Sequence, residues 1–148
     1  MLPITEADPG DAKALSALHQ ACFIPGWDTD AISNLFSANH ARAFGVQSEG
    51  HWIAFALVSP CVDDVELLTI ATHPDHRGQG LARQVLGNVI VRYRFDGFKR
   101  ILLEVAEDNA SAIRLYQGLD FQNDGRRPRY YARPDNTRVD AILMSVEL

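Results

Sequence analysis

The sequence has little of what several protein classes require. Cysteine occurs only twice in 148 residues, at Cys22 and Cys61, which is too few for a disulfide framework. The longest uninterrupted run of Ala, Val, Ile, Leu and Phe covers 53–58, whereas a membrane-spanning helix needs about 20 apolar residues. The first residues lack the basic character of a secretory signal. We therefore expect a cytoplasmic protein that makes no use of a membrane.

Basic residues are also fewer than acidic ones. The chain has 14 Lys and Arg against 19 Asp and Glu, for a formal net charge of −5. Because Lys and Arg dominate phosphate binding, this balance argues against nucleic acid as the main partner. Long-range attraction instead favours a basic or amine-bearing partner. The length and the 47% hydrophobic content suit one globular domain over residues 1–148.

The basic residues that are present gather near the C-terminus, where five arginines fall in the last fifth of the chain. Two interpretations are open: a solvated loop, which we favour, or a surface that contacts an anion or the substrate. The cluster comprises Arg126, Arg127, Arg129, Arg133 and Arg138.

Hydrophobic periodicity predicts an α/β fold. Helical spacing recurs in several segments, and short apolar or alternating runs mark strands between them. The run at 65–72 is apolar on both faces, which is typical of a strand covered on both sides. The order of elements predicts a mixed central β-sheet with helices on both faces and a right-handed crossover at its centre. The expected elements, in chain order, are a strand at 2–6, helices from 8 or 11 to 22 and from 28 or 29 onward, strands at 43–47, 52–58 and 65–72, a long helix from 81 that ends before 97, a buried strand at 100–106, a helix from 109 to 116, an extended segment from 121 and a strand at 139–146.

A glycine-rich segment, Arg77-Gly78-Gln79-Gly80, joins the strand at 65–72 to the long helix. The first N–H groups of a helix lack intrahelical partners and carry partial positive charge, so such a junction can bind an anion. Glycine lets the backbone approach a phosphate without an intervening Cβ. The spacing matches neither the dinucleotide fingerprint nor the phosphate loop that ends in Gly-Lys-Ser/Thr. The segment is either an ordinary turn or a binding site for a pyrophosphate of another kind.

One carboxylate, Glu104, interrupts the apolar strand at 100–106. An unpaired carboxylate in such a strand would cost several kcal/mol, so this group must be paired, protonated or directed at a cleft. Period-2 alternation puts it on one face with Leu102 and Ala106. A structural ion pair with one of the arginines is one interpretation. A general base in an active site is the interpretation that we favour.

Tyr116 lies near the end of the helix that directly follows this strand. A lone helical tyrosine usually packs in the core with its hydroxyl at the rim. Alternatively, a phenol with a pKa of about 10 can donate a proton to a leaving thiolate with a pKa of about 8.5.

Other reactive side chains give weaker indications. His73 and His76 have a spacing that suits a metal, but no third ligand lies nearby, and we expect no metal site. Nothing in the sequence activates Cys22, so we expect a packed thiol rather than a nucleophile.

Residues 65–121 resemble the Gcn5-related N-acetyltransferase (GNAT) superfamily. The strand 67–71, Pro74 and the pattern Arg77-x-x-Gly80-x-Ala82 are similar to that family's acetyl-coenzyme A (acetyl-CoA) motif. Over nearly the whole chain the sequence resembles one branch, the bacterial enzymes that acetylate the N-terminal alanine of ribosomal protein S18. The features that carry this second resemblance are Pro25-Gly-Trp27, Leu103-Glu-Val105, Asn109-Ala-x-Ala-Ile-x-Leu-Tyr116, Arg127-x-x-Tyr130-Tyr131 and Asp140-Ala-Ile-x-Met144.

The resemblance implies one GNAT domain that uses acetyl-CoA as co-substrate and no metal. It implies direct attack of an amine on the thioester, with Glu104 as proton acceptor and Tyr116 as proton donor. It also implies that the substrate contacts Trp27, Tyr130 and Tyr131. The implied coenzyme contacts are the backbone of Ile70, Ala71 and Thr72 along the pantetheine arm, Arg77, Gly78, Gln79, Gly80, Leu81, Ala82 and Arg83 around the pyrophosphate, and Asn109.

The implied acceptor is the N-terminal peptide of ribosomal protein S18 or another basic peptide. An α-amine has a pKa near 8 and a lysine near 10.4, so neutralising them at pH 7 costs about 1.4 and about 4.6 kcal/mol. A single carboxylate that acts through water suits the first better. Two alternatives are open: an enzyme that acetylates a small-molecule amine or a lysine side chain, and an acyl-CoA-binding module without catalysis. The second would need neither Glu104 nor Tyr116.

The sequence departs from the family pattern at one turn. The family's Tyr-x-x-x-Gly-Phe becomes Tyr116-Gln-Gly-Leu-Asp120-Phe121 here. If the glycine position has a left-handed backbone, Asp is among the residues that tolerate it.

Overall fold

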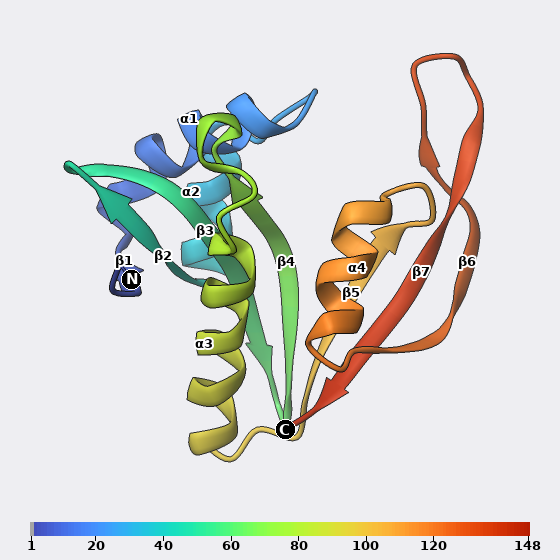
Figure 1. The fold of residues 1–148 in the computed structure, drawn as a ribbon. Coiled ribbons are helices and arrows are strands. Elements are labelled where there is room, and N and C mark those ends of the chain that lie inside the picture. Colours follow the sequence, from blue (N-terminus) through green and yellow to red (C-terminus); the bar gives the residue numbers. More distant parts are fainter. Residues whose placement is uncertain (1) are drawn as a thin grey trace.

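The computed structural model describes residues 2–148, which form one mixed seven-stranded sheet with helices on both faces (Figure 1). The strand order is β1-β2-β3-β4-β5-β7-β6, and every neighbouring pair is antiparallel except β4 and β5. The fold class predicted from the sequence is therefore confirmed. The strands are β1 (Thr5–Ala7), β2 (Arg42–Ser48), β3 (His51–Cys61), β4 (Asp64–Thr72), β5 (Arg100–Ala106), β6 (Gln122–Ala132) and β7 (Arg138–Glu147).

Two hydrophobic cores attach the helices to opposite faces of the sheet. One core joins α3 and α4 to the sheet and includes Val85, Tyr93 and Tyr116. The other joins α1 to the opposite face through Leu15, Phe55 and their neighbours, with α2 beside it. None of the helices within residues 2–148 has both the length and the apolar character that a membrane crossing requires. The helices are α1 (Ala12–Cys22), α2 (Thr29–Ala38), α3 (Leu81–Phe95) and α4 (Ala110–Gly118), with short 3-10 turns at Pro9–Asp11 and Pro74–His76.

Side-chain caps start two of the helices where the sequence predicts. The Asp28 carboxylate accepts a hydrogen bond of 2.8 Å from the backbone N–H of Ala31 at the start of α2. Asn109 Oδ1 accepts one of 3.3 Å from Ala112 at the start of α4. At the N-terminus the first strand begins at Thr5 rather than at residue 2. Of the two aspartates expected to start the first helix, Asp8 caps the 3-10 turn, and Asp11 is the N-cap residue of α1 without a side-chain hydrogen bond to that helix.

β4 is covered on both faces as predicted, since Val65 and Leu67 pack in the core with α3 and Ala71 packs in the core with α1. β5 is buried on one face alone, so the expectation of a buried strand at 100–106 is confirmed for that face only. In β5 the side chains of Ile101, Leu103 and Val105 are buried, whereas Leu102 and Glu104 on the opposite face are only half-buried. The reason is that α1 and α2 cover their face of the sheet only as far as β4. The uncovered face of β5 is left open for other contacts.

The two parallel strands separate soon after they meet. Pairing between β4 and β5 is confined to Asp64–Glu66 opposite Arg100–Leu102. Beyond this point β4 remains paired with β3 as far as Thr72, while β5 continues beside β7. The strands diverge toward the top of Figure 1. Within residues 2–148, the edge of β4 that faces β5 is therefore without a strand partner from 67 onward. Apart from the Thr72 carbonyl, which accepts from Cys22 and Arg77, the backbone groups along this edge are available to a ligand.

Candidate active site

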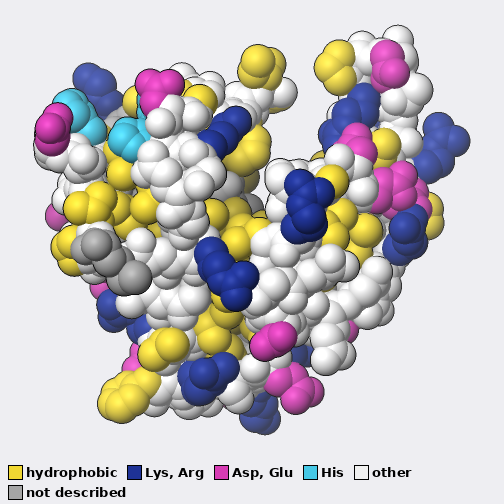
Figure 2. Space-filling model, in the orientation of Figure 1, with side chains coloured by type: hydrophobic (Ala, Val, Ile, Leu, Met, Phe, Trp, Pro, Cys, Tyr) yellow, Lys and Arg dark blue, Asp and Glu magenta, His cyan; other side chains and the backbone are white. Residues whose placement is uncertain are grey.

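Two adjoining pockets occupy the gap between β4 and β5. The glycine pocket, of about 500 Å³, lies between the 77–83 segment, the end of β4 and α4. The carboxylate pocket, of about 550 Å³, lies between β4, β5 and the end of β6, and Glu104 lines it. Phe23, Ile70, Asn109 and Ala112 line both pockets, so the two lie side by side along the gap. Figure 2 shows the molecule hollowed between its two upper lobes, with hydrophobic side chains in the floor.

The glycine pocket has the features of an anion site at a helix start. Gly78 and Gly80 have φ of +78° and +76°, a left-handed conformation that favours glycine. A Cβ built at either position meets no atom within 4 Å and would project into open space. Gly80 is the N-cap of α3 and gives it no side-chain cap, so the first N–H groups of this helix remain available.

Two arginines line the same pocket, and each donates a hydrogen bond to a backbone carbonyl. Arg77 Nε donates a hydrogen bond of 3.2 Å to the carbonyl of Thr72. Arg83 donates one of 3.1 Å from Nη2 to the carbonyl of Gly118 at the end of α4. Both guanidinium groups belong to exposed residues, and they add positive charge where an anion would approach the start of α3.

Glu104 takes part in an ion pair while it lines the carboxylate pocket. Its Oε1 lies 2.8 Å from Arg127 Nε, and the side chain retains 24% exposure. The two interpretations drawn from the sequence are therefore not exclusive, since one carboxylate oxygen meets an arginine and the residue still faces the hollow. The guanidinium of Arg127 also stands 5.5 Å from the centre of the Tyr130 ring.

Tyr116 closes one side of the carboxylate pocket. It is only 6% exposed and packs against the ring of Phe121 at 5.6 Å between centroids. Burial raises the pKa of Tyr116 to about 12. Asp120, in the turn after α4, has φ of +68°, so the left-handed expectation for this position is confirmed.

The arginine cluster is not one loop: Arg126, Arg127 and Arg129 lie in the edge strand β6, Arg133 directly follows it, and Arg138 begins β7. Arg126 Nη1 meets Glu107 and Asp140, each at 2.8 Å. Arg133 makes a two-pronged contact with Asp108. The pairing partners come from the loop after β5 and from β7, and they could not be identified from sequence spacing because β6 and β7 pair with two irregularities in register.

Most of the residues expected to bind the coenzyme come together in the structure, although Gln79 is exposed and lines neither pocket. Tyr131 lines the carboxylate pocket, whereas Tyr130 is 47% exposed beside it. Trp27 lines neither pocket, and its ring instead stacks on His19 at 4.6 Å. The expected residues that line the glycine pocket are Ile70, Ala71, Thr72, Arg77, Gly78, Gly80, Leu81, Ala82, Arg83 and Asn109.

Sequence reasoning missed several lining residues. Phe23 and Cys22 reach the glycine pocket from the end of α1, and Cys22 Sγ donates to the carbonyl of Thr72 at 3.2 Å. No sequence signal pointed to them, since α1 is far from β4 along the chain. Thr69 could have been noticed as a hydroxyl within the apolar run of β4. It lines the carboxylate pocket.

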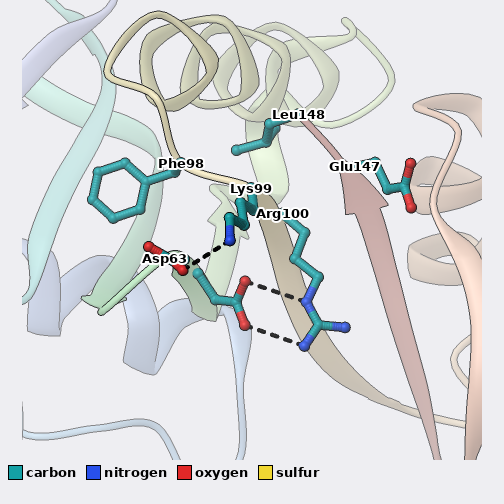
Figure 3. A pocket seen from close by; sticks show the side chains of 7 residues that line it. Asp63, Phe98, Lys99, Arg100, Glu147 and Leu148 are labelled. Atoms are coloured by element: carbon teal, nitrogen blue, oxygen red, sulfur yellow. Dashed lines mark hydrogen bonds and ion pairs between the residues drawn. The ribbon is translucent and has the colours of Figure 1, made fainter.

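Two other features do not form a second site. Within residues 2–148, no group of three or more His, Cys, Asp and Glu side chains is arranged to hold a metal ion. A pocket at the closed end of the sheet is lined by five charged side chains, and four of them form two ion pairs (Figure 3). Asp63 pairs with Lys99 at 3.1 Å and Asp64 with Arg100 at 3.2 Å, which joins the β3–β4 turn to the start of β5.

Comparisons with known proteins agree with this geometry. The model of the acetyltransferase (GNAT) family matches residues 12–121. The chain is 36% identical over 148 residues to the [ribosomal protein bS18]-alanine N-acetyltransferase of Escherichia coli K12, covering 100% of this chain and 99% of the relative. The corresponding Haemophilus ducreyi protein is 28% identical over 138 residues, 93% of this chain and 94% of its own length.

Solved structures extend the comparison. The crystal structure of the ribosomal-protein-S18-alanine N-acetyltransferase from Escherichia coli superposes with a TM-score of 0.89 at 31% identity, covering 99% of this chain and 94% of the other. The protein yncA of Salmonella typhimurium, solved with its cofactor acetyl-CoA, shares the fold with a TM-score of 0.82 at 22% identity, covering 99% of this chain and 94% of the other.

Proposed function

Because the chain belongs to the acetyltransferase (GNAT) family, we propose that it transfers the acetyl group of acetyl-CoA to the N-terminal alanine of ribosomal protein S18. The observation that carries this proposal is that the glycine pocket and the carboxylate pocket adjoin and share four lining residues, so a thioester held in one would lie beside an amine held in the other. Full-length similarity to enzymes named for that acceptor supports the choice of substrate.

The residues of the glycine pocket fit a coenzyme with a pyrophosphate. The uncapped N–H groups at the start of α3 and the guanidinium of Arg83 would hold the phosphates. The space beside Gly78 and Gly80 leaves room for them. The unpaired edge of β4 at Ile70–Thr72 would hydrogen-bond the pantetheine arm, with Asn109 on the other side. Bound acetyl-CoA supplies the acetyl group as a thioester.

Glu104 would accept the proton that the amine loses as it attacks. It lines the pocket where the amine would lie, and it can act directly or through one water molecule. Arg127 would fix the orientation of the carboxylate through its contact with Oε1. An α-amine with a pKa near 8 is mostly protonated at neutral pH, but removing that proton costs little. One carboxylate is therefore sufficient as the base.

Tyr116 would stabilise the departing sulfur as a hydrogen-bond donor. With a pKa of about 12, its phenol stays protonated at any working pH. Complete proton transfer to a thiolate with a pKa of about 8.5 would be uphill by about 3.5 pKa units, or about 5 kcal/mol. A hydrogen bond to the developing negative charge avoids that cost, and this is the role that we assign to Tyr116.

The peptide would enter along β6. Tyr131 lines the carboxylate pocket, and the exposed Tyr130 lies beside it at 5.0 Å between ring centroids. On the other side of the hollow, Phe23 and the fully exposed Ile24 extend from the end of α1. Side chains of this kind suit a short extended peptide better than a small polar amine.

A panel of acceptors tests the proposal. Three substrates would be offered with acetyl-CoA: a peptide with the S18 N-terminus, the same peptide blocked at its α-amine but containing lysine, and a polyamine. We expect acetylation of the first alone, located on the α-amine by fragment mass spectrometry. Acetylation of the blocked peptide or of the polyamine instead would contradict the proposal and would indicate a lysine or small-amine acetyltransferase.

A further inference from the structure

A buried histidine, His19, lies on the face of α1 that packs on the sheet, and none of the roles above uses it. It is 4% exposed. The Trp27 ring is stacked on its imidazole with a centroid distance of 4.6 Å and an interplanar angle of 12°. The Phe23 ring packs on it at 4.4 Å. These two contacts hold the imidazole ring in one orientation.

The hydrogen bonds of His19 determine which ring nitrogen carries the proton. The backbone N–H of Trp27 donates to Nδ1 at 2.9 Å, so Nδ1 is an acceptor. A neutral imidazole whose Nδ1 accepts carries its proton on Nε2. Nε2 lies 3.0 Å from Thr69 Oγ1 and therefore donates to it. Burial lowers the pKa of His19 to about 4, so this neutral form persists at neutral pH.

The Thr69 hydroxyl is consequently an acceptor toward His19 and a donor in another direction. Its oxygen accepts the hydrogen bond from His19, so its own proton must point toward a different acceptor. Among residues 2–148 this is the one hydrogen bond that the hydroxyl makes with protein. Thr69 lines the carboxylate pocket together with Glu104 and Tyr116.

Thr69 and Glu104 project from the same face of the sheet. Thr69 points to the α1 side, since it bonds to His19. Leu103 and Val105 are buried in the core on the α3 side, so alternation directs Glu104 to the α1 side. The donor hydroxyl and the carboxylate thus face one hollow from the two separated strands.

The inference rests on the proposed function: we propose that Thr69, held by His19, donates a hydrogen bond to the first carbonyl oxygen of the acceptor peptide. A proton donor matches a carbonyl oxygen, whereas the hydrogens of an amine need an acceptor such as Glu104. In an N-terminal residue the carbonyl lies one carbon from the α-amine, so the two groups can meet Thr69 and Glu104 together. A lysine ε-amine or a simple polyamine has no carbonyl at that position. The pair therefore selects α-amines, and Trp27 contributes by holding His19.

The test compares binding of two ligands to wild type and to Thr69 variants. One ligand is the alanine-starting peptide, and the other is its analogue in which the first carbonyl is a methylene group. Dissociation constants would be measured by calorimetry in the presence of coenzyme A, which permits no transfer. One neutral hydrogen bond corresponds to a preference of about three- to tenfold for the peptide. Thr69→Val should abolish this preference, and Thr69→Ser should retain it.

Two further variants separate positioning from structure. His19→Phe should lower the preference for the peptide as Thr69→Val does, and the double variant should show no further loss. His19→Gln can preserve both hydrogen bonds, so it should retain the preference. Thr5→Val makes the same change on β1, away from both pockets, and should have no effect.

A preference that survives in Thr69→Val would overturn the inference. So would an equal loss of affinity for both ligands, which would show that the hydroxyl supports the fold of the site and does not contact the first carbonyl. Failure of the wild type to bind or acetylate any peptide would instead refute the proposed function, and the two failures are therefore distinguishable.

Discussion

At the residue scale, burial keeps two ionisable side chains beside the hollow uncharged. Tyr116 remains a phenol because removal from water raises its pKa to about 12. His19 remains neutral because burial lowers its pKa to about 4. In both cases the neutral form retains a proton that can be donated, from the phenol in one and from Nε2 in the other. The site is thus supplied with donors that do not change across the physiological pH range.

Replacement of Tyr116 by Phe should lower kcat with acetyl-CoA and an alanine-starting peptide by about ten- to 100-fold, because one hydrogen bond to a charged sulfur is lost. KM for the peptide should change little. Since the pKa is raised, loss of the phenol proton should begin only well above pH 10, so Tyr116 should cause no fall in rate below that pH. A phenolate absorbance change near pH 10 that disappears in Tyr116→Phe would contradict this.

The buried His19 should make the protein less stable in mild acid. Its pKa is lowered from 6.5 to about 4 on folding, so the unfolded chain binds a proton between these values and the folded chain does not. Stability from this residue is therefore full above pH 6.5 and is lost as pH falls toward 4. Between pH 7 and pH 5 the loss should be about 2 kcal/mol. Urea unfolding of wild type and His19→Gln at pH 7 and pH 5 measures this loss as the difference between the two proteins in their change of unfolding free energy. Equal changes in the two proteins would contradict the view that His19 causes the loss.

At the element scale, the turn between β4 and α3 determines what the site can hold. Gly78 and Gly80 both have left-handed backbones, and the helix that follows begins without a side-chain cap. Because β4 separates from β5, the edge of β4 beyond residue 66 is the second surface available to a ligand. In the proposed function neither feature would suffice alone, because the phosphates would bind at the start of α3 and the pantetheine arm along β4.

Gly80→Ala should weaken acetyl-CoA binding by about tenfold, which corresponds to about 1.4 kcal/mol. An alanine in this conformation also costs about 1 kcal/mol of stability. Gly50→Ala is a matched control, because Gly50 has φ of +79° and an equally open Cβ position, but lies in the β2–β3 turn. Calorimetry with acetyl-CoA and thermal unfolding of both variants separate the two effects. Similar affinities in the two variants would contradict the role of Gly80.

The sequence predicted the elements better than the hollow between them. The bounds of β5, the start of α4 at Asn109 and the extent of α3 are confirmed because each depends on local periodicity or capping. The length of pairing between β4 and β5 depends on how α4 and β7 pack, which no local pattern reports. The Arg127 partner of Glu104 and the contact of Trp27 with His19 were unpredictable for the same reason.

At the scale of the whole molecule, the net charge of −5 does not describe the site. Glu104, Glu107, Asp108 and Asp140 stand around the carboxylate pocket and the adjoining strand, and each is paired with an arginine of the C-terminal segment. Such pairs organise an edge strand more than they stabilise it, since exposed ion pairs contribute little free energy. The glycine pocket, in contrast, is lined by Arg77 and Arg83, which would attract the anionic coenzyme that we propose.

The most direct test of the account is the rate of acetyl transfer to the α-amine of an S18 N-terminal peptide by wild type, Glu104→Gln and Glu107→Gln, followed by mass spectrometry. Both glutamates contact an arginine at 2.8 Å, but only Glu104 lines the carboxylate pocket. We expect wild type and Glu107→Gln to acetylate the peptide at similar rates and Glu104→Gln to be slower by a factor on the order of 100 to 10,000. Equal rates for all three proteins would contradict the assignment of Glu104, and no transfer by the wild type would contradict the proposed function.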